Sequence, residues 1–195
     1  MENDELTSIV NSYLEESLNC MEISARSAEI SGKIVEAARI CIDSISSGGK
    51  IIFMGNGGSA ADSQHLATEL VSRYKSERRA IPAISLTVDS SAITAIGNDY
   101  SFDDIFSRQI QANARAEDVV IGITTSGSSL NIINGLNEAV KNGCRTISLT
   151  GMGGGDVSGI CDLTICAPSE NTPVIQQAHI TYGHAICDLI ERSTS

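Results

Sequence analysis

Five short segments along the chain are rich in apolar residues, and each of these runs predicts a β-strand. The runs lie at residues 50–54, 82–88, 118–124, 144–150 and 162–167. The run at residues 118–124, DVVIGIT, is continuously apolar, which suits a parallel strand that is covered on both faces. The pattern therefore predicts a buried parallel sheet of about five strands.

Other segments carry apolar residues at every third or fourth position, which is the spacing of an amphipathic helix. They lie at residues 6–21, 31–46, 60–73, 90–97, 103–114 and 172–192. Strands that alternate with helices predict an α/β fold of the doubly wound type, a three-layer α/β/α sandwich. In such a fold we expect ligands to bind beyond the carboxyl ends of the strands.

The N-terminal region is predicted to be helical and to lie outside the sheet. A chain of 195 residues fits one domain with a sizeable core. We therefore expect a single domain over residues 1–195, with N-terminal helices at 1–47 and an α/β core with a C-terminal helix at 48–195. The apolar stripe of the first helix favours a homo-oligomer.

A glycine-rich turn and a helix follow the first predicted strand, with the sequence GNGGSAADSQHLATELVSR at residues 55–73. The glycines let backbone N–H groups approach an anion, and Ser59 is in place to cap the helix that follows it. His65 and Glu69 lie one turn apart on this helix, and Arg73 continues the same stripe. The alternative is an ordinary turn followed by a solvated His–Glu pair.

A second loop, TTSGSSLNII at residues 124–133, follows the third predicted strand and precedes a helix. Unpaired N–H groups and the helix dipole can bind a phosphate there without a Lys or Arg. Simple capping of the helix is the alternative. The hydroxyl groups that converge on this loop belong to Thr124, Thr125, Ser126 and Ser129.

The last predicted helix carries two histidines on different faces. Gln176 and His184 share one face with Ile180 between them, whereas His179 points elsewhere. A helical histidine in an apolar context is more often a core or interface residue. Spacing alone therefore assigns neither histidine a functional role.

Two other glycine-containing segments are expected to be irregular. The helix that begins near residue 90 is predicted to break at Gly97, which places Asn98 and Asp99 in a loop. Residues 151–157, GMGGGDV, are expected to form a flexible connection after the fourth strand.

Charge and cysteine content limit the classes of function. The net charge of −11 argues against a nucleic-acid-binding surface. The nearest thing to a basic patch consists of Arg73, Lys75, Arg78 and Arg79, and we expect all but Arg73 to belong to a solvated turn.

No apolar run approaches the ~20 residues that span a bilayer, and the acidic N-terminus is unlike a secretory signal. The six cysteines form no CxxC pair, so we expect buried free thiols and a cytoplasmic protein.

Six segments taken together resemble the sugar isomerase (SIS) domain, and specifically the sedoheptulose 7-phosphate isomerases. They are GNGGSAADSQH, ELVSRY, AIGNDYSFDDIFSRQ, TTSGSS, SLTGMGGG and IQQAHITYGH. The resemblance implies a homotetramer with active sites at subunit interfaces. It implies an isomerase that converts D-sedoheptulose 7-phosphate to D-glycero-D-manno-heptose 7-phosphate through an enediolate, the first step of bacterial heptose synthesis.

The resemblance also implies roles for individual residues. Glu69 and His184 would be the catalytic acid–base pair. Candidate phosphate ligands are Thr124, Thr125, Ser126 and Ser129. Candidate contacts to the rest of the substrate are Asn56, Gly57, Gly58, Ser59, Glu69, Arg73, Asn98, Asp99 and Gln176.

Zinc is the cofactor that the resemblance implies, with one ion per subunit. Its ligands would be His65, Glu69, Gln176 and His184. Gln is a weak zinc ligand, and a zinc-bound Glu69 would be a poorer base than a free one, so the metal and acid–base roles partly compete.

The chain departs from the family pattern near the predicted site. Residues 173–177 read PVIQQ where many members read ARIQE, and Thr124 and Ser128 replace a common Ser and Asn. These changes bear on substrate preference but leave the catalytic set intact. The alternatives are an isomerase of another phosphosugar and a non-catalytic SIS binding module of the kind that associates with the replication initiator. Such modules lack the Glu and His kept here at 69 and 184, and a sugar-phosphate-sensing regulator would carry an added DNA-binding domain.

Overall fold

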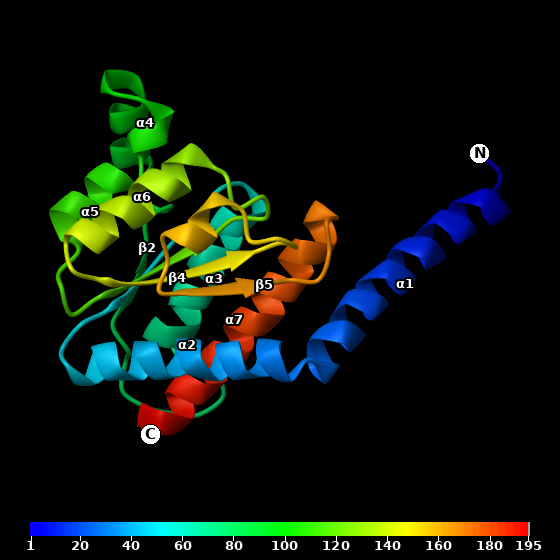
Figure 1. Ribbon diagram of the computed structural model, residues 1–195, viewed down its shortest axis with the longest axis horizontal. Coiled ribbons are helices and arrows are strands. Elements are labelled where there is room, and N and C mark those ends of the chain that lie inside the picture. The colour runs from blue at the N-terminus through cyan, green and yellow to red at the C-terminus, as the bar shows by residue number, and fades with distance from the viewer. Residues whose placement is uncertain (195) are drawn as a thin grey trace.

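The computed structural model describes residues 1–194, and its centre is a sheet of five parallel strands (Figure 1). Neighbouring strands follow the order β2-β1-β3-β4-β5. The prediction of a parallel α/β sheet of about five strands is confirmed. The strands are β1 (Ile51–Gly55), β2 (Ala83–Ser85), β3 (Val119–Ile123), β4 (Arg145–Thr150) and β5 (Leu163–Cys166).

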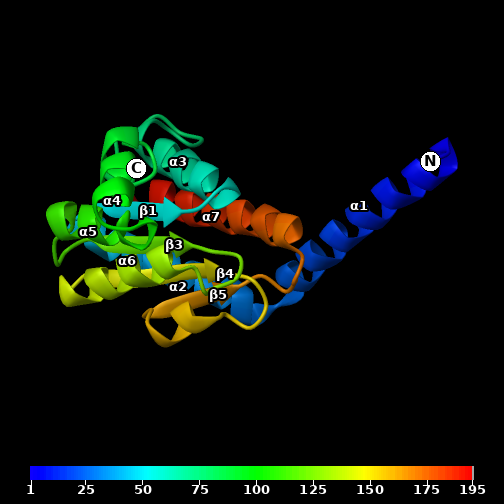
Figure 2. The same cartoon turned by 90° about the horizontal axis from the view of Figure 1, so that it is seen from above.

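Helices cover both faces of the sheet and complete the three predicted layers (Figures 1 and 2). One face is covered by α2 (Ala28–Ser46), α3 (Gly58–Val71) and α7 (Thr172–Thr194). The other face is covered by α4 (Ser90–Asp99), η1 (Phe102–Asp104), α5 (Ser107–Asn113), α6 (Leu130–Lys141) and η2 (Asp156–Gly159).

β1 and β3 read as continuous apolar runs because each of them supplies two separate cores, whereas β4 buries the polar side chains of Thr146, Ser148 and Thr150. Successive side chains of a strand point to opposite faces of the sheet. In β1, Ile51 and Phe53 pack beneath α2, α3 and α7, whereas Ile52 and Met54 pack beneath α5 and α6. Neither face of the strand is left for polar residues.

The two N-terminal helices have different roles. α2 packs on the sheet and on α7, whereas α1 (Asn3–Arg26) projects away from the body of the molecule (Figures 1 and 2). The buried residues of α1 are Ser17, Cys20 and Ser24, and the Ser24 hydroxyl lies 2.6 Å from the Tyr182 hydroxyl. The apolar stripe of α1 is exposed and consists of Leu6, Ile9, Val10, Tyr13, Leu14 and Leu18.

None of the helices in residues 1–194 combines the length and the apolar character that a membrane span requires.

The prediction that Asn98 and Asp99 lie in a loop is wrong, because α4 continues through Gly97 and ends at Asp99. A glycine inside a helix costs only ~1 kcal/mol relative to alanine. Here the Asp89 side chain accepts a hydrogen bond from the Ala92 N–H and caps the helix, and Ile96 packs on the core. The cap and the packing together outweigh the glycine.

Candidate active site

The two predicted ligand loops meet where the chain reverses its direction of travel across the sheet. β1 and β3 are neighbours, with Gly55 paired to Ile123 at their carboxyl ends. β1 leads into α3 on one face and β3 leads into α6 on the other. Ligands bind at such a switch point in doubly wound sheets. The loop after β1 and the loop after β3 therefore form a single candidate site.

A pair of amide side chains links the two loops. The Asn56 Nδ2 donates to Asn131 Oδ1 at 2.8 Å, and the Asn131 Nδ2 donates to Asn56 Oδ1 at 2.9 Å. Asn131 is buried in the first turn of α6. The sequence analysis missed Asn131, because its partner lies 75 residues away and no local pattern connects the two.

The start of α3 differs from the predicted capping arrangement. The helix begins at Gly58, and Gly57 takes the capping position with a φ of 56° that favours glycine. Ser59 is therefore already inside the first turn, where it is buried and makes no capping hydrogen bond. A Cβ on Gly55 would lie 2.4 Å from the Ser59 carbonyl oxygen, so only glycine fits this tight turn.

The loop after β3 gathers hydroxyl groups at the start of α6, as predicted. The Thr124 Oγ1 accepts a hydrogen bond from the Gly127 N–H at 3.3 Å and lies 3.4 Å from the Ser129 Oγ. Ser129 precedes α6, but its side chain makes no capping hydrogen bond. Capping thus does not account for this serine, and its hydroxyl remains available to a ligand.

Residues 151–157 support this loop and are not merely a flexible connection. The Gly151 N–H donates to the Thr125 carbonyl at 3.0 Å, and the Val157 N–H donates to the Gly127 carbonyl at 3.1 Å. A Cβ on Gly127 would lie 2.2 Å from the Gly154 carbonyl oxygen. The two glycine-rich segments therefore pack backbone against backbone, which requires glycine at position 127.

A polar pocket opens between the two loops and the start of α7. Gln176 closes it from the α7 side, and a Cβ on Gly58 would lie 2.5 Å from the Gln176 Nε2. Ser126 is exposed beside the pocket. The residues that line the pocket are Asn56, Gly57, Gly58, Ser59, Ile123, Thr124, Thr125, Ser129, Thr172 and Gln176.

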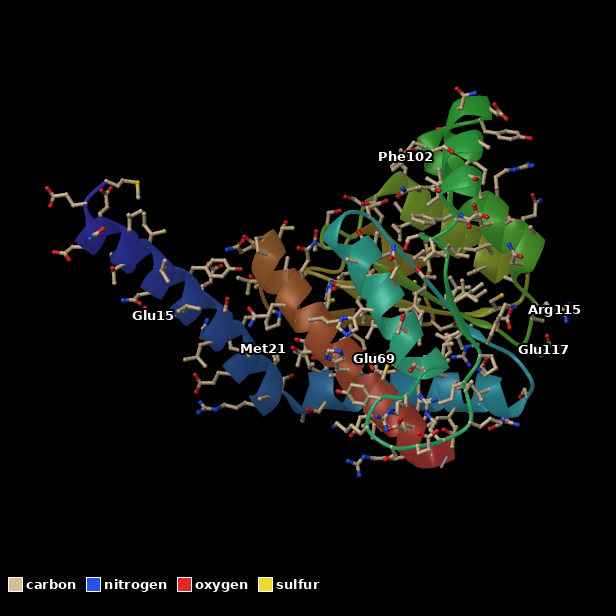
Figure 3. The ribbon with its side chains drawn as sticks, turned by 180° about the vertical axis from the view of Figure 1, so that it is seen from behind. Glu15, Met21, Glu69, Phe102, Arg115 and Glu117 are labelled. Atoms are coloured by element: carbon tan, nitrogen blue, oxygen red, sulfur yellow. The ribbon has the colours of Figure 1, made fainter. Side chains whose placement is uncertain are left out.

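A cluster of three titratable side chains lies farther along the face where α3 meets α7. The His65 Nε2 lies 3.1 Å from Glu69 Oε1 and 3.3 Å from the His184 Nε2. One ligand atom from each of these three residues lies within 4.8 Å of the others. Figure 3 shows Glu69 on α3 beside α7. The fold therefore joins the predicted acid–base pair, although 115 positions separate the two residues in the sequence.

Close packing of two helices brings His184 to His65. Gly183 packs against Leu66, and a Cβ at position 183 would lie 2.5 Å from a Leu66 methyl carbon. Each of these residues is the immediate neighbour of a histidine in the cluster. The missing side chain at position 183 therefore sets the approach of the two helices and the distance between the imidazoles.

The His184 imidazole has aromatic rings on two sides. The Tyr74 ring is stacked on it, with centroids 5.5 Å apart and planes inclined by 26°, and the edge contact with His65 has a centroid distance of 4.9 Å. Burial lowers the pKa of His184, the charges of His65 and Lys75 lower it further, and Glu69 acts in the opposite direction. His184 is therefore neutral at neutral pH and can accept or donate a proton.

Arg73 does not continue the stripe of His65 and Glu69, so that prediction is wrong. α3 ends at Val71, and Arg73 lies beyond it with its side chain 66% exposed and 3.9 Å from Glu77. The helix stops two residues before Arg73, and the helical spacing therefore no longer applies to it.

Asn98 and Asp99 do not reach the pocket within this chain. Both are exposed, and the Asn98 Nδ2 donates to the Asp99 Oδ1 at 2.8 Å. Phe102, which follows them closely in the sequence, lies far from Glu69 in Figure 3. Their contact with substrate stays a prediction.

Three further residues beside the cluster were missed by the sequence analysis. Tyr74 contacts His184, and the Arg78 and Glu191 side chains form a buried ion pair below it. Arg78 is not part of a solvated turn, since its side chain is 1% exposed. Its partner lies at the far end of the chain, so no local pattern marked it.

Comparisons with known proteins agree with this geometry. The model of the SIS domain family matches residues 12–151. The phosphoheptose isomerase of Citrifermentans bemidjiense is 51% identical over 174 residues, which cover 89% of this chain and 91% of the relative. The phosphoheptose isomerase of Nitratiruptor sp. is 52% identical over 165 residues, which cover 85% of this chain and 88% of the relative.

Solved structures give the same assignment. The phosphoheptose isomerase of Neisseria gonorrhoeae superposes with a TM-score of 0.90 at 38% identity, covering 96% of this chain and 99% of that one. That of Francisella tularensis gives a TM-score of 0.92 at 35% identity, covering 95% and 98%. The chain therefore belongs to the SIS domain family and, within it, to the phosphoheptose isomerases.

Proposed function

We propose that this isomerase interconverts D-sedoheptulose 7-phosphate and D-glycero-D-manno-heptose 7-phosphate, the first step of bacterial heptose synthesis. The observation that carries the proposal is the cluster of His65, Glu69 and His184. His184 lies on the same face of α7 as Gln176, which lines the polar pocket. One end of the site can thus hold a phosphate while the other moves protons. The name phosphoheptose isomerase of the similar proteins gives the substrate class.

The hydroxyl-lined loop after β3 would bind the phosphate. Thr124, Thr125, Ser126 and Ser129 offer hydroxyl groups at the start of α6, whose dipole attracts an anion. Asn56, Gly57, Gly58 and Ser59 would lie along the sugar chain. Arg73, Asn98 and Asp99 would complete the site from a neighbouring subunit, which is consistent with their exposure in this chain.

Glu69 and His184 would transfer the protons of an enediolate mechanism. The Glu69 carboxylate takes a proton from C1 of the ketose while the His184 imidazole gives a proton to O2. His184 then recovers the proton of O1, and Glu69 returns its proton to C2, which yields the aldose. Groups of this kind typically contribute ~10²- to 10⁴-fold to the rate.

Zinc fits the donor set at this place. Two imidazoles and a carboxylate are ordinary zinc ligands, and the His65 and His184 Nε2 atoms face each other at 3.3 Å. His65, Glu69 and His184 would hold the ion, with Gln176 as the fourth ligand. When bound, zinc would stabilise negative charge on the sugar oxygens. Metal analysis of the purified protein tests this, and a His65→Ala variant is expected to lose bound zinc.

We also propose a cytoplasmic homotetramer with one zinc ion per subunit. The exposed apolar stripe of α1 supports assembly, because contiguous apolar surface of this kind marks an interaction site. The six unpaired cysteines support a reducing compartment.

A turnover assay across sugar phosphates tests the proposed reaction. Purified protein is incubated with D-sedoheptulose 7-phosphate, and the aldose product is followed by NMR of its anomeric proton. Pentulose 5-phosphate and hexulose 6-phosphate serve as matched controls. Conversion of either control in preference to the heptulose would overturn the substrate assignment.

A further inference from the structure

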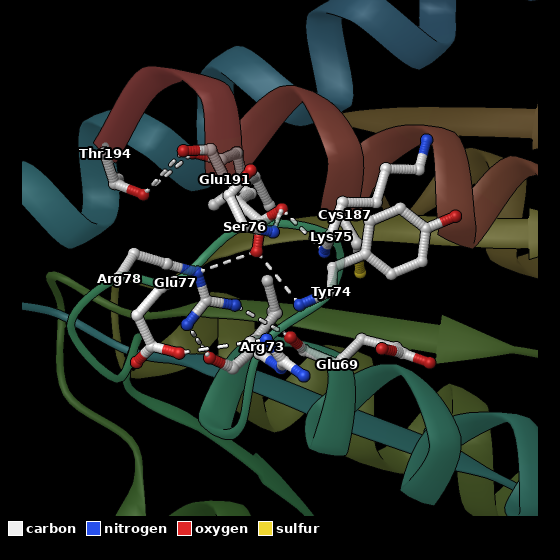
Figure 4. A network of polar contacts seen from close by, with 12 residues as sticks. Glu69, Arg73, Tyr74, Lys75, Ser76, Glu77, Arg78, Cys187, Glu191 and Thr194 are labelled. Carbon is white, nitrogen blue, oxygen red and sulfur yellow. Dashed lines mark hydrogen bonds and ion pairs between the residues drawn. The ribbon is translucent and has the colours of Figure 1, made fainter.

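A single carboxylate organises the loop that follows α3. Glu191 of α7 accepts hydrogen bonds from three successive backbone N–H groups, those of Tyr74, Lys75 and Ser76, at 2.9, 2.8 and 2.9 Å (Figure 4). Successive N–H groups that converge in this way form an anion-binding concavity. Here the protein's own carboxylate fills it, so the backbone at residues 74–76 is fixed to α7.

Arg78 fixes the end of α3 in the same region. Its guanidinium donates to the carbonyl groups of Glu69 and Leu70, each at 2.8 Å, and of Ser72 at 3.0 Å. These carbonyls belong to the last turn of the helix and its C-cap, where helical N–H partners run out, and the Leu70 carbonyl also accepts from the Ile81 N–H at 3.1 Å. Arg78 Nε also lies 3.2 Å from Glu191 Oε1. We call this ion pair the Arg78–Glu191 clamp.

The clamp joins the two helices that carry the acid–base pair. Glu69 supplies one of the carbonyls that Arg78 binds, and Glu191 lies two helical turns after His184 on α7. The two side chains of the clamp are 1% and 3% exposed. Both side chains of this buried ion pair are also hydrogen-bonded to backbone groups, so the pair restrains the two helix segments relative to each other.

The clamp also fixes the backbone that carries the Tyr74 ring. The Tyr74 backbone N–H is bonded to Glu191, and its ring is stacked on His184, which also makes the edge contact with His65. The Lys75 Nζ lies 4.9 Å from the centre of the same ring and 3.1 Å from Asp188 of α7. Without the Tyr74 ring, one face of the His184 imidazole would lose its packing contact, and the imidazole could rotate toward solvent.

We propose that Tyr74 is a positioning residue for His184, and that the Arg78–Glu191 clamp holds it in place. The inference deepens the proposed function and rests on it, since it assigns Tyr74 a part only if His184 transfers protons. The contact is made by the ring face, so the ring and not the hydroxyl is the part that acts. A proton-transfer group displaced by about 1 Å can lose up to ~10²-fold in rate.

Kinetics of Tyr74 variants test the proposal. Tyr74→Ala is expected to lower kcat about 10-fold or more while KM for the sugar phosphate stays within about twofold, because the phosphate loop is untouched. Tyr74→Phe keeps the ring and is expected to retain near-normal kcat. Arg79→Ala, an exposed side chain on the same loop, is the matched control for general damage to the loop. Wild-type kcat in Tyr74→Ala, or an equal loss in Tyr74→Phe, overturns the proposal.

A double-mutant cycle separates this proposal from the proposed function. In a His184→Asn background, Tyr74→Ala is expected to cause no further loss of kcat, because the group that Tyr74 positions is gone. A full additional loss there shows that Tyr74 acts independently and overturns the inference alone. Near-normal turnover by His184→Asn itself contradicts the proposed role of His184 instead. Circular dichroism of each variant confirms that the fold is intact.

Discussion

His179 and His184 lie on the same helix, but their surroundings give them different chemistry. His184 is partly exposed in the site, whereas His179 is fully buried with its Nε2 2.9 Å from the Thr150 carbonyl oxygen. Burial lowers the pKa of His179 to about 4, although the hydrogen bond to Thr150 acts in the opposite direction. His179 thus stays neutral and braces the end of β4, and the structure confirms that it points away from His184.

The buried His179 is expected to make stability depend on pH. Its pKa is lower in the folded chain than the ordinary value of 6.5. Between about pH 6.5 and about pH 4 the unfolded chain therefore binds more protons than the folded one. The free energy of unfolding should fall as the pH drops through this range, by about 2 kcal/mol between about pH 7.5 and about pH 5.

Urea unfolding at the two pH values measures this effect. His179→Gln keeps an N–H donor for the Thr150 carbonyl but does not titrate. It should show a smaller loss of stability on acidification than the wild type, by about the same 2 kcal/mol. An identical pH dependence in both proteins would show that His179 is not the titrating group.

Glu69 and His184 are expected to act as one catalytic unit. Glu69→Gln and His184→Asn should each lower kcat by ~10²- to 10⁴-fold and leave phosphate binding largely intact. The double variant should be little worse than the poorer single variant, because either change already breaks the proton path. Steady-state kinetics with parallel metal analysis checks this. Losses that multiply in the double variant would indicate two independent roles.

At the scale of single elements, a helix start carries the proposed phosphate site. α6 begins after a loop whose hydroxyl groups are not used for capping and whose turn is supported by residues 151–157. These backbone contacts support the loop in addition to the Thr124 and Ser126 hydroxyls, which accept hydrogen bonds from the Gly127 and Ser128 N–H groups.

Removal of two hydroxyls from this loop should weaken substrate binding more than chemistry. Ser126→Ala with Ser129→Ala is expected to raise KM about 10-fold or more with little change in kcat, because the phosphate is bound alike in the ground and transition states. Initial-rate kinetics against the sugar phosphate measure it, and Ser158→Ala on the nearby η2 is a matched control. An unchanged KM in the double variant would remove the loop from the site.

At the scale of the whole molecule, the projecting helix α1 is the feature that a single chain leaves unexplained. Leu14 and Leu18 are 58% and 67% exposed on its apolar stripe. Burial of such a side chain contributes about 1.5–3 kcal/mol, so a stripe of them favours contact with another copy of the chain. The domain boundaries predicted for residues 1–195 stay a prediction.

Charged substitutions on this stripe should disrupt the assembly. Leu14→Glu with Leu18→Glu is expected to shift the predicted tetramer toward smaller species in multi-angle light scattering and to lower activity, since sites shared between subunits would be lost. Ser12→Glu, on a polar position of α1, is the control. A wild-type protein that is monomeric and fully active would contradict both the assembly and the shared site.

The sequence by itself determined the layers of this fold and the chemistry of its two loops. Continuous apolar runs such as residues 118–124 predicted buried parallel strands, because each strand must supply a core on both faces. The hydroxyl groups at Thr124 and Ser129 predicted an anion site, because a strand, a glycine turn and a helix start are contiguous in sequence. Motif resemblance, and not spacing, singled out Glu69 and His184.

Only the tertiary structure decided how distant segments meet. Asn56 meets Asn131, Tyr74 meets His184, and Arg78 meets Glu191, and each pair is separated by 75 or more positions in the chain. Local patterns describe neighbours within a few residues, so they carry no record of such contacts. Local patterns also did not predict where α3 ends, which is why Arg73 was placed on the helix. The carbonyl groups at the end of α3 accept hydrogen bonds from Arg78, and Arg78 pairs with the distant Glu191.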